Sequence, residues 1–194
     1  EEISVRKIAE ESNYTSATLY YYFDDINNLL TFVSIKYLSP FIREQKYIKE
    51  NYIDSIDKFV KTWKAILQYA FKYPNQYFML FYGDYSGQLL DILNIYFQLY
   101  SNELEPSIEN FPLIRNDNNK MLMPLLDFCI AHGHIKAQNK EKLIEVIEII
   151  FKGMLQKLID EENNNPREME NRMIEYIKLF LKSYKTPIGM SFRL

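Results

Sequence analysis

The sequence contains little cysteine, little glycine and no long apolar run. Of its 194 residues, one is a cysteine, Cys129, and five are glycines. A single cysteine excludes an internal disulfide and fits a reducing compartment, so we expect a cytoplasmic protein. No apolar run reaches the ~18 residues that a membrane-spanning helix needs, so we expect no membrane partner. The net charge of −3 argues against a protein that coats nucleic acids or membrane surfaces.

The chain also lacks the motifs of common enzyme classes. No nucleophile stands beside a base, no acidic pair forms a motif, and no glycine-rich loop could cradle a phosphate. Cys129, His132 and His134 are metal-ligating residues at close spacing, but a fourth ligand is not evident. A buried cysteine followed by histidines at a helix C-terminus accounts for them equally well. The sequence therefore predicts no enzymatic activity, no metal and no cofactor.

Hydrophobic residues make up 47% of the chain and recur at helical spacing along most of it. Residues 25–46 are predicted to form a linking helix that Pro40 kinks or ends. Further helices are predicted over residues 52–73, 89–104, 121–131, 141–160 and from 166 onward, and 105–119 is rich in proline and asparagine and predicts a loop. We find no alternating strand pattern, so the predicted fold class is all-α.

Residues 3–30 indicate two short helices joined by a tight turn. Ser4 and Thr15 are predicted caps, because their hydroxyls can accept hydrogen bonds from the unpaired N–H groups of a first helical turn. Asn13 stands where the chain must turn sharply, and asparagine enters the left-handed region at modest cost. The second helix is expected to pack three residues inward: Leu19, Tyr22 and Phe23. This pattern is a helix-turn-helix.

The outer face of the second helix is small at its start and hydrogen-bonding along its length. Such a helix suits the major groove, since small residues let the backbone approach phosphates and longer side chains reach base edges. The residues expected on this face are Ser16, Ala17, Thr18, Tyr20 and Tyr21. A polar helix in an ordinary helical bundle is the alternative interpretation.

These residues resemble the DNA-binding motif of the tetracycline-repressor (TetR) family. The resemblance rests on residues 4–10 (SVRKIAE), on 15–23 (TSATLYYYF) and on Leu29 and Leu30. It implies that Ser4, Thr15, Thr18 and Tyr20 contact backbone phosphate, and that Ser16, Ala17 and Tyr21 face bases. Arg6, on the solvent side of the first helix, completes the predicted DNA-binding set. The family places a further helix, commonly rich in lysine and arginine, before this motif, and we interpret the chain as lacking it.

Two features favour a different function. Ile26 stands where the family usually has a lysine that binds phosphate. Residues 1–50 carry six basic and eight acidic residues, a net charge of −2, whereas DNA-binding modules are typically basic. The alternative is a helical, dimeric ligand- or protein-binding module with little or no DNA affinity.

The region after residue 46 is unusually aromatic, as expected of a pocket for a small apolar or aromatic effector, although each ring could equally belong to the core. The residues predicted to line such a pocket are Trp63, Tyr77, Phe78, Phe81, Tyr82, Tyr96, Tyr100 and Phe128. The helix over 141–160 has one polar stripe, which includes Glu148 and Lys152, and is apolar over most of its remaining surface.

That helix and the last one have surplus apolar surface, which suggests a four-helix bundle formed by two subunits. The predicted interface residues are Ile147, Ile150, Phe151, Met154, Ile177 and Phe180, and Gly153 is expected to permit close helix contact. We therefore expect a DNA-binding domain with its linking helix over 1–46, and a ligand-binding and dimerisation domain over 47–194. The expected function is a transcriptional regulator, a repressor, that binds a palindromic operator on double-stranded DNA as a homodimer and is released by the effector.

Overall fold

The computed structural model describes residues 3–100, 123–136, 138, 140–161 and 164–184. Within these ranges the chain forms helices joined by turns and no β-strand, which confirms the all-α prediction. The elements are α1 (Val5–Glu11), α2 (Ser16–Tyr22), α3 (Ile26–Ser34), the 3₁₀ helix η1 (Ile35–Leu38), α4 (Ser39–Asn51), α5 (Ser55–Lys72), α6 (Pro74–Tyr82), the 3₁₀ helix η2 (Ser86–Gln88), α7 (Leu89–Leu99), α8 (Met123–Ala131), α9 (Lys140–Asp160) and α10 (Pro166–Tyr184). None of the described helices is long and apolar enough to cross a membrane. The predicted loop at 105–119 lies outside the described residues.

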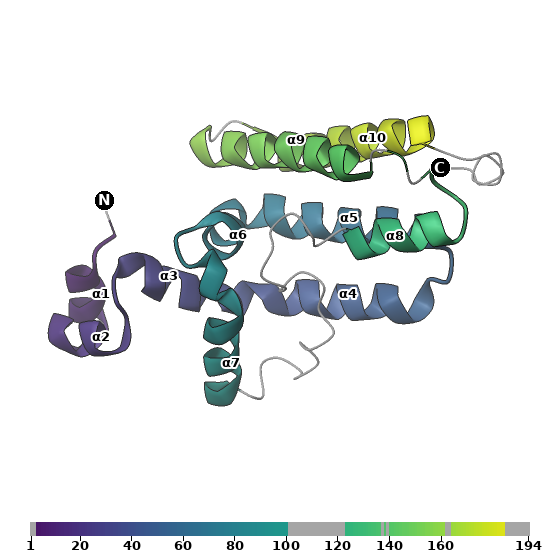
Figure 1. The fold of residues 1–194 in the computed structure, drawn as a ribbon. Coiled ribbons are helices and arrows are strands. Elements are labelled where there is room, and N and C mark those ends of the chain that lie inside the picture. The colour runs from purple at the N-terminus through teal and green to yellow at the C-terminus, as the bar shows by residue number, and fades with distance from the viewer. Residues whose placement is uncertain (1–2, 101–122, 137, 139, 162–163, 185–194) are drawn as a thin grey trace.

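The helices divide into a small N-terminal lobe and a larger bundle (Figure 1). α1 and α2 form the lobe at one end, and α3 leads from it into the bundle. α4 and α5 run side by side, and α9 and α10 form a layer on the other side of α5. α5 contacts α4, α6, α8, α9 and α10, so it is the central helix of the bundle.

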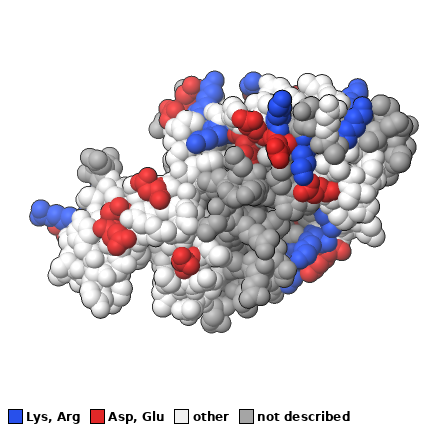
Figure 2. Space-filling model, in the orientation of Figure 1, with Lys and Arg blue, Asp and Glu red and all other residues white. Residues whose placement is uncertain are grey.

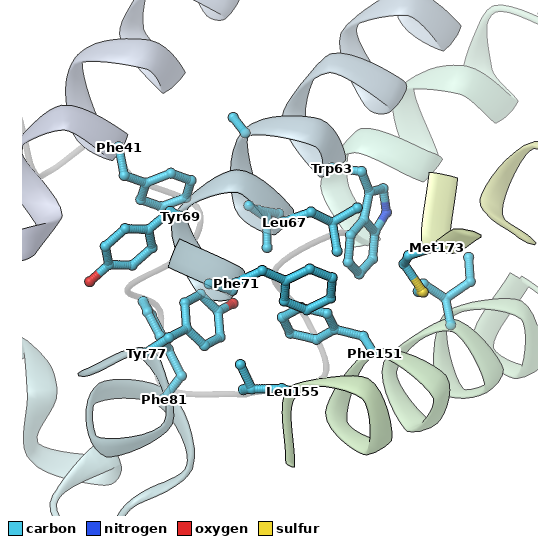
Figure 3. Packing of buried hydrophobic residues seen from close by; sticks show 14 of the residues in the cluster. Phe41, Trp63, Leu67, Tyr69, Phe71, Tyr77, Phe81, Phe151, Leu155 and Met173 are labelled. Carbon is cyan, nitrogen blue, oxygen red and sulfur yellow. The ribbon is translucent and has the colours of Figure 1, made fainter. Parts of the chain in front are cut away.

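The centre of the bundle is aromatic. α5 buries Phe59, Trp63 and Ile66 almost completely, and each such side chain contributes about 1.5–3 kcal/mol through burial. Figure 3 shows the rings of Phe71 from α5 and Phe151 from α9 stacked against each other, with ring centroids 6.0 Å apart. Trp63 meets the same Phe151 ring edge-on at 5.8 Å, so one aromatic core joins α5 to α9.

The predicted linking helix is divided into three segments. α3 ends at Ser34, η1 tightens the chain over Ile35–Leu38, and α4 begins at Ser39 with Pro40 in its first turn. Proline has no N–H to donate to the preceding turn, and its ring crowds the carbonyl four residues earlier. The chain therefore cannot continue as a regular α-helix through residue 40, and a short 3₁₀ segment absorbs the mismatch. This confirms the predicted effect of Pro40.

Candidate DNA-binding face and effector region

α1 and α2 have the predicted caps, and the chain between them has the predicted turn. The Ser4 hydroxyl accepts a hydrogen bond from the Lys7 N–H at 3.3 Å, and the Thr15 hydroxyl accepts one from the Thr18 N–H at 3.1 Å. Asn13 adopts a left-handed conformation with φ of 58°. These features follow from local sequence, because each cap bonds within its own first turn.

All eight predicted DNA-binding residues have side chains at the surface. Tyr20 and Tyr21 are exposed, Tyr21 to 82%, and Ser16 and Thr18 are partly exposed. Arg6 is exposed too, but its Nε donates a hydrogen bond to the Glu10 carboxylate at 3.0 Å. On the face that Figure 2 shows, the lobe is largely uncharged, with basic groups at its outer tip and acidic groups nearer the bundle.

The prediction that Tyr22 packs inward is wrong. Tyr22 is 70% exposed, and its ring stands edge-on to that of Tyr21 with centroids 5.0 Å apart. Every residue of α2 keeps some exposure, and Leu19 and Phe23 are only half-buried. The reason is that α2 packs chiefly on α1. A partner of seven residues covers one side of α2 and leaves Tyr22 in solvent.

The lobe is joined to the bundle through α3. Asp25 caps α3, since its Oδ1 accepts the Asn28 N–H at 2.8 Å, and its Oδ2 accepts the Tyr85 hydroxyl at 3.0 Å. Asn27 Nδ2 donates to Asp84 Oδ2 at 3.0 Å. Asp84 and Tyr85 both lie in the turn between α6 and η2, which therefore holds the first turn of α3 by two side-chain hydrogen bonds.

A line of rings makes a second connection between lobe and bundle. The Phe23 ring, directly after α2, lies 5.6 Å from that of Phe32 on α3. Phe32 in turn lies 5.2 Å from Tyr96 on α7. Neither connection was predicted from sequence, because the residues of α3 and their partners near α6 and on α7 are separated by about sixty residues and no local pattern pairs them.

The structure divides the predicted pocket residues among three places. Tyr77, Phe81, Phe78 and Tyr82 cluster on α6, with Trp63 reached through Phe151. Tyr96 and Tyr100 pack on each other and on Phe32. Phe128 is exposed and lies against His132. Most of these rings pack against one another. The cluster on α6 brings together more of the predicted pocket residues than either of the other two places.

Polar groups lie among the rings of the bundle. Trp63 Nε1 and Tyr69 Oη are buried without a hydrogen-bond partner among the described residues, and burial, together with the nearby Tyr73, raises the pKa of Tyr69. Glu148 on α9 is half-buried, and burial raises the pKa of its carboxyl to about 7. Glu148 belongs to the polar stripe predicted on this helix, and helical periodicity alone does not reveal that α6 covers this part of α9.

Four of the predicted interface residues are core residues of the single chain. Ile147, Phe151, Met154 and Ile177 are buried within the protomer, while Ile150 and Phe180 are half-buried. The apolar side of α9 and α10 faces α5 and α6, so those four side chains are not available to a second chain. The exposed apolar residues on the two helices are Val146, Ile149 and Leu179. Nothing lies within 4 Å of a Cβ placed on Gly153, which leaves that position open.

The cysteine and histidines near the end of α8 make other contacts. Cys129 is buried, and the Nδ1 of His132 lies 2.8 Å from the Phe128 carbonyl oxygen. No group of three or more His, Cys, Asp or Glu residues that could hold a metal occurs within the described ranges.

Comparisons of the chain with protein-family models, with curated proteins and with solved structures gave no match.

Proposed function

We propose that the protein is a ligand-responsive transcriptional regulator that binds DNA as a homodimer. The observation that carries this proposal is the lobe itself: two capped helices joined at a left-handed Asn13, with hydroxyl and tyrosine side chains exposed along α2. That arrangement suits a helix-turn-helix whose second helix enters the major groove. The family resemblance of the same residues supports the proposal.

In this proposal phosphate contacts position the lobe and base contacts give specificity. Ser4, Thr15 and Tyr20 would bind phosphate oxygens, and Tyr21 would reach base edges from its exposed position. The pairing of Arg6 with Glu10 reduces the charge available for phosphate. We therefore expect binding to depend on hydroxyl and backbone N–H donors more than on lysine and arginine.

The exposed apolar residues of α9 and α10 support a homodimer. Val146 and Ile149 lie on the same outer side of α9 as Gly153, where the missing side chain leaves room for a second helix. Leu179 on α10 is also exposed. Burying these residues against their symmetry copies would place two recognition helices on one operator, and half-sites lie about 34–36 Å apart on such DNA.

The contacts of α3 support a route from effector to DNA. Because Asp84 and Tyr85 hold the first turn of α3, a ligand that moves the end of α6 would also move α3 and the attached lobe. The ligand needs to bind one of the two positions of α3 more favourably than the other by only about 1–3 kcal/mol of binding free energy. We infer a repressor released by its effector.

The test is DNA binding by the full-length protein, measured by fluorescence anisotropy on labelled fragments that tile the DNA upstream of its own gene. We expect the protein to bind one fragment at low salt, and we expect that complex to persist in an excess of unrelated competitor DNA. Equal, weak binding to every fragment, or none, would refute the proposal.

A second candidate is a helical dimer that binds ligand but has little DNA affinity. Ile26, half-buried at the start of α3 where a phosphate-binding lysine would be expected, favours it. A salt titration separates the two candidates, since affinity for DNA falls steeply with salt while affinity for an apolar ligand barely changes.

A further inference from the structure

Glu148 is an unpaired carboxyl group in the contact between α6 and α9. It makes no hydrogen bond or ion pair with any described residue, and its neighbours Ile147 and Phe151 are buried. A half-buried carboxylate without a partner loses hydration and gains nothing in return, and this burial raises its pKa to about 7. A cation bound beside this carboxyl group would stabilise its ionised form.

The ring of Tyr82 lies on the other side of the same contact and already receives a cation. The Lys152 ammonium, one helical turn after Glu148, sits 4.8 Å from the centroid of that ring. This is within the ~6 Å over which a cation is attracted to an aromatic face. Lys152 is exposed, so its flexible side chain can leave the ring for solvent at little cost.

The carboxylate of Glu148 lies close enough to two tyrosines of α6 to affect their ionisation. Burial is the largest cause that raises the pKa of both Tyr77 and Tyr82, and the negative charge of Glu148 adds to it in each case. Phe78 and Tyr77 flank Tyr82, with ring centroids 5.6 Å and 6.3 Å away. A carboxylate, a partly exposed ring under the Lys152 ammonium and neighbouring aromatic side chains therefore lie together where α6 meets α9.

We propose that the effector is an organic cation with an apolar body, bound between α6 and α9 with its charge over Tyr82 and beside the carboxylate of Glu148. This inference rests on the proposed function, because it names the effector of that regulator. An anion would meet the charge of Glu148, and a neutral molecule would leave the carboxylate uncompensated. A cation is attracted to the carboxylate and compensates its charge. It would replace the Lys152 ammonium over the ring of Tyr82. The site lies on the helix whose last turn leads to Asp84 and Tyr85, the residues that hold α3.

The test uses benzyltrimethylammonium as the cationic probe and neopentylbenzene, which has the same shape without the charge, as its neutral match. Binding to the full-length protein without DNA is measured by calorimetry, with the emission of Trp63, the single tryptophan, as a second signal. We expect the cation to bind roughly tenfold or more tightly than its neutral match. Equal affinity for the two compounds, or no binding of the cation, would overturn the inference.

Two substitutions on α9 are expected to act in opposite directions. Glu148→Gln keeps the shape of the side chain and should weaken cation binding roughly tenfold, whereas Lys152→Met removes the competing ammonium and should strengthen it. Glu145→Gln, at an exposed position on the same helix, is the matched control and should change little. If the Glu145 variant weakens binding as much as the Glu148 variant, the attraction is a general surface effect and the site is wrong.

The pH dependence provides a test that needs no variant. Tyr77 and Tyr82 lie near Glu148 on α6, and their raised pKa values keep both side chains neutral from pH 6 to pH 8. Lys152 lies one helical turn along α9, over the Tyr82 ring. Because the cation binds the ionised carboxylate, affinity should rise about tenfold between pH 6 and pH 8 and level off above that. A flat profile would contradict the role of Glu148.

None of these measurements involves DNA. A failure of cation binding would therefore leave the proposed regulation of transcription intact, and a failure of DNA binding would leave the cation measurements interpretable.

Discussion

The hydroxyl of Tyr85 donates a hydrogen bond to Asp25, the same carboxylate that caps α3. One oxygen of Asp25 therefore caps α3, the helix that leads from the N-terminal lobe, and the other binds the turn after α6. Any displacement of that turn acts directly on the cap of α3.

Tyr85→Phe removes the hydrogen bond and keeps the ring. We expect the folded protein to bind DNA but to respond less to effector, because one contact that transmits the movement is lost. A hydrogen bond of this kind contributes about 0.5–1.5 kcal/mol, so the effector should change DNA affinity a few-fold less than in the natural protein. The measurement is DNA affinity with and without effector. Tyr47→Phe, at an exposed tyrosine on α4, is the control, and an equal change there would argue against a special role of Tyr85.

Substitutions in α2 should separate specificity from affinity if α2 is the recognition helix that we propose. Tyr21→Ala removes a side chain expected to reach base edges, so discrimination against altered operators should fall by about 1–3 kcal/mol. Tyr20→Phe removes a hydroxyl expected to bind phosphate, so affinity should fall for all sequences alike. Anisotropy measurements on a set of single-base operator variants distinguish the two. Similar profiles for both variants would show that these roles are misassigned.

Ile149→Glu should dissociate the proposed dimer without unfolding the chain, since Ile149 is 64% exposed in the protomer. A charge at the centre of an apolar interface has to be desolvated, which costs several kcal/mol. Sedimentation or light scattering should then report a monomer with reduced operator affinity. Ile95→Glu, at an exposed apolar position on α7, should leave the mass unchanged. A dimer that persists in the Ile149 variant would place the interface elsewhere.

Glu148 should make the protein less stable as the pH rises from about 4.5 to about 7. Its carboxyl is protonated more readily in the folded protein than in the unfolded chain, because burial raises the folded pKa to about 7. Over that range the folded state binds more protons, so the free energy of unfolding falls as the pH rises through the folded pKa and levels off roughly one pH unit above it. After allowance for solvent screening at a half-exposed site, the loss is about 1–2 kcal/mol. Urea denaturation at pH 5 and pH 7.5 measures it, and Glu148→Gln should remove this component.

Asn13→Ala should destabilise the lobe, because the left-handed conformation costs a residue with an ordinary Cβ roughly 1–2 kcal/mol. Asn13→Gly tolerates the same φ and serves as the control. Hydrogen exchange of α1 and α2 amides reports local stability of the lobe. Equal protection in the alanine and glycine variants would show that the turn relaxes around residue 13.

Local sequence predicted what local interactions determine. The caps at Ser4 and Thr15 and the turn at Asn13 each depend on residues within a few positions, so they could be identified without knowing the fold. Asp25 caps α3 through an equally local hydrogen bond. The same holds for Asn165, whose side chain accepts hydrogen bonds from the first turn of α10.

Features that depend on distant neighbours could not be found in this way. Tyr22 has the spacing of a core residue, but whether it is buried depends on which helix covers it. Ile147 and Phe151 have the spacing of an interface, yet α5 and α6 already cover them. Tyr85 and Glu148 gained their proposed roles from partners on other helices. Periodicity shows that a face is apolar and does not show what packs against it.

The break at Pro40 gives α3 the properties of a lever arm. α3 has nine residues, and at ~1.5 Å per residue it reaches roughly 13 Å from η1. A bend of ~15° at η1 would carry its far end through roughly 3–4 Å, which is about the ~3.4 Å rise of one base pair. A bend of this size would break the hydrogen bonds that join Asp25 and Asn27 to Tyr85 and Asp84 unless the turn after α6 moved with α3. In the proposed regulator, the position of α2 on DNA would therefore follow the position of that turn.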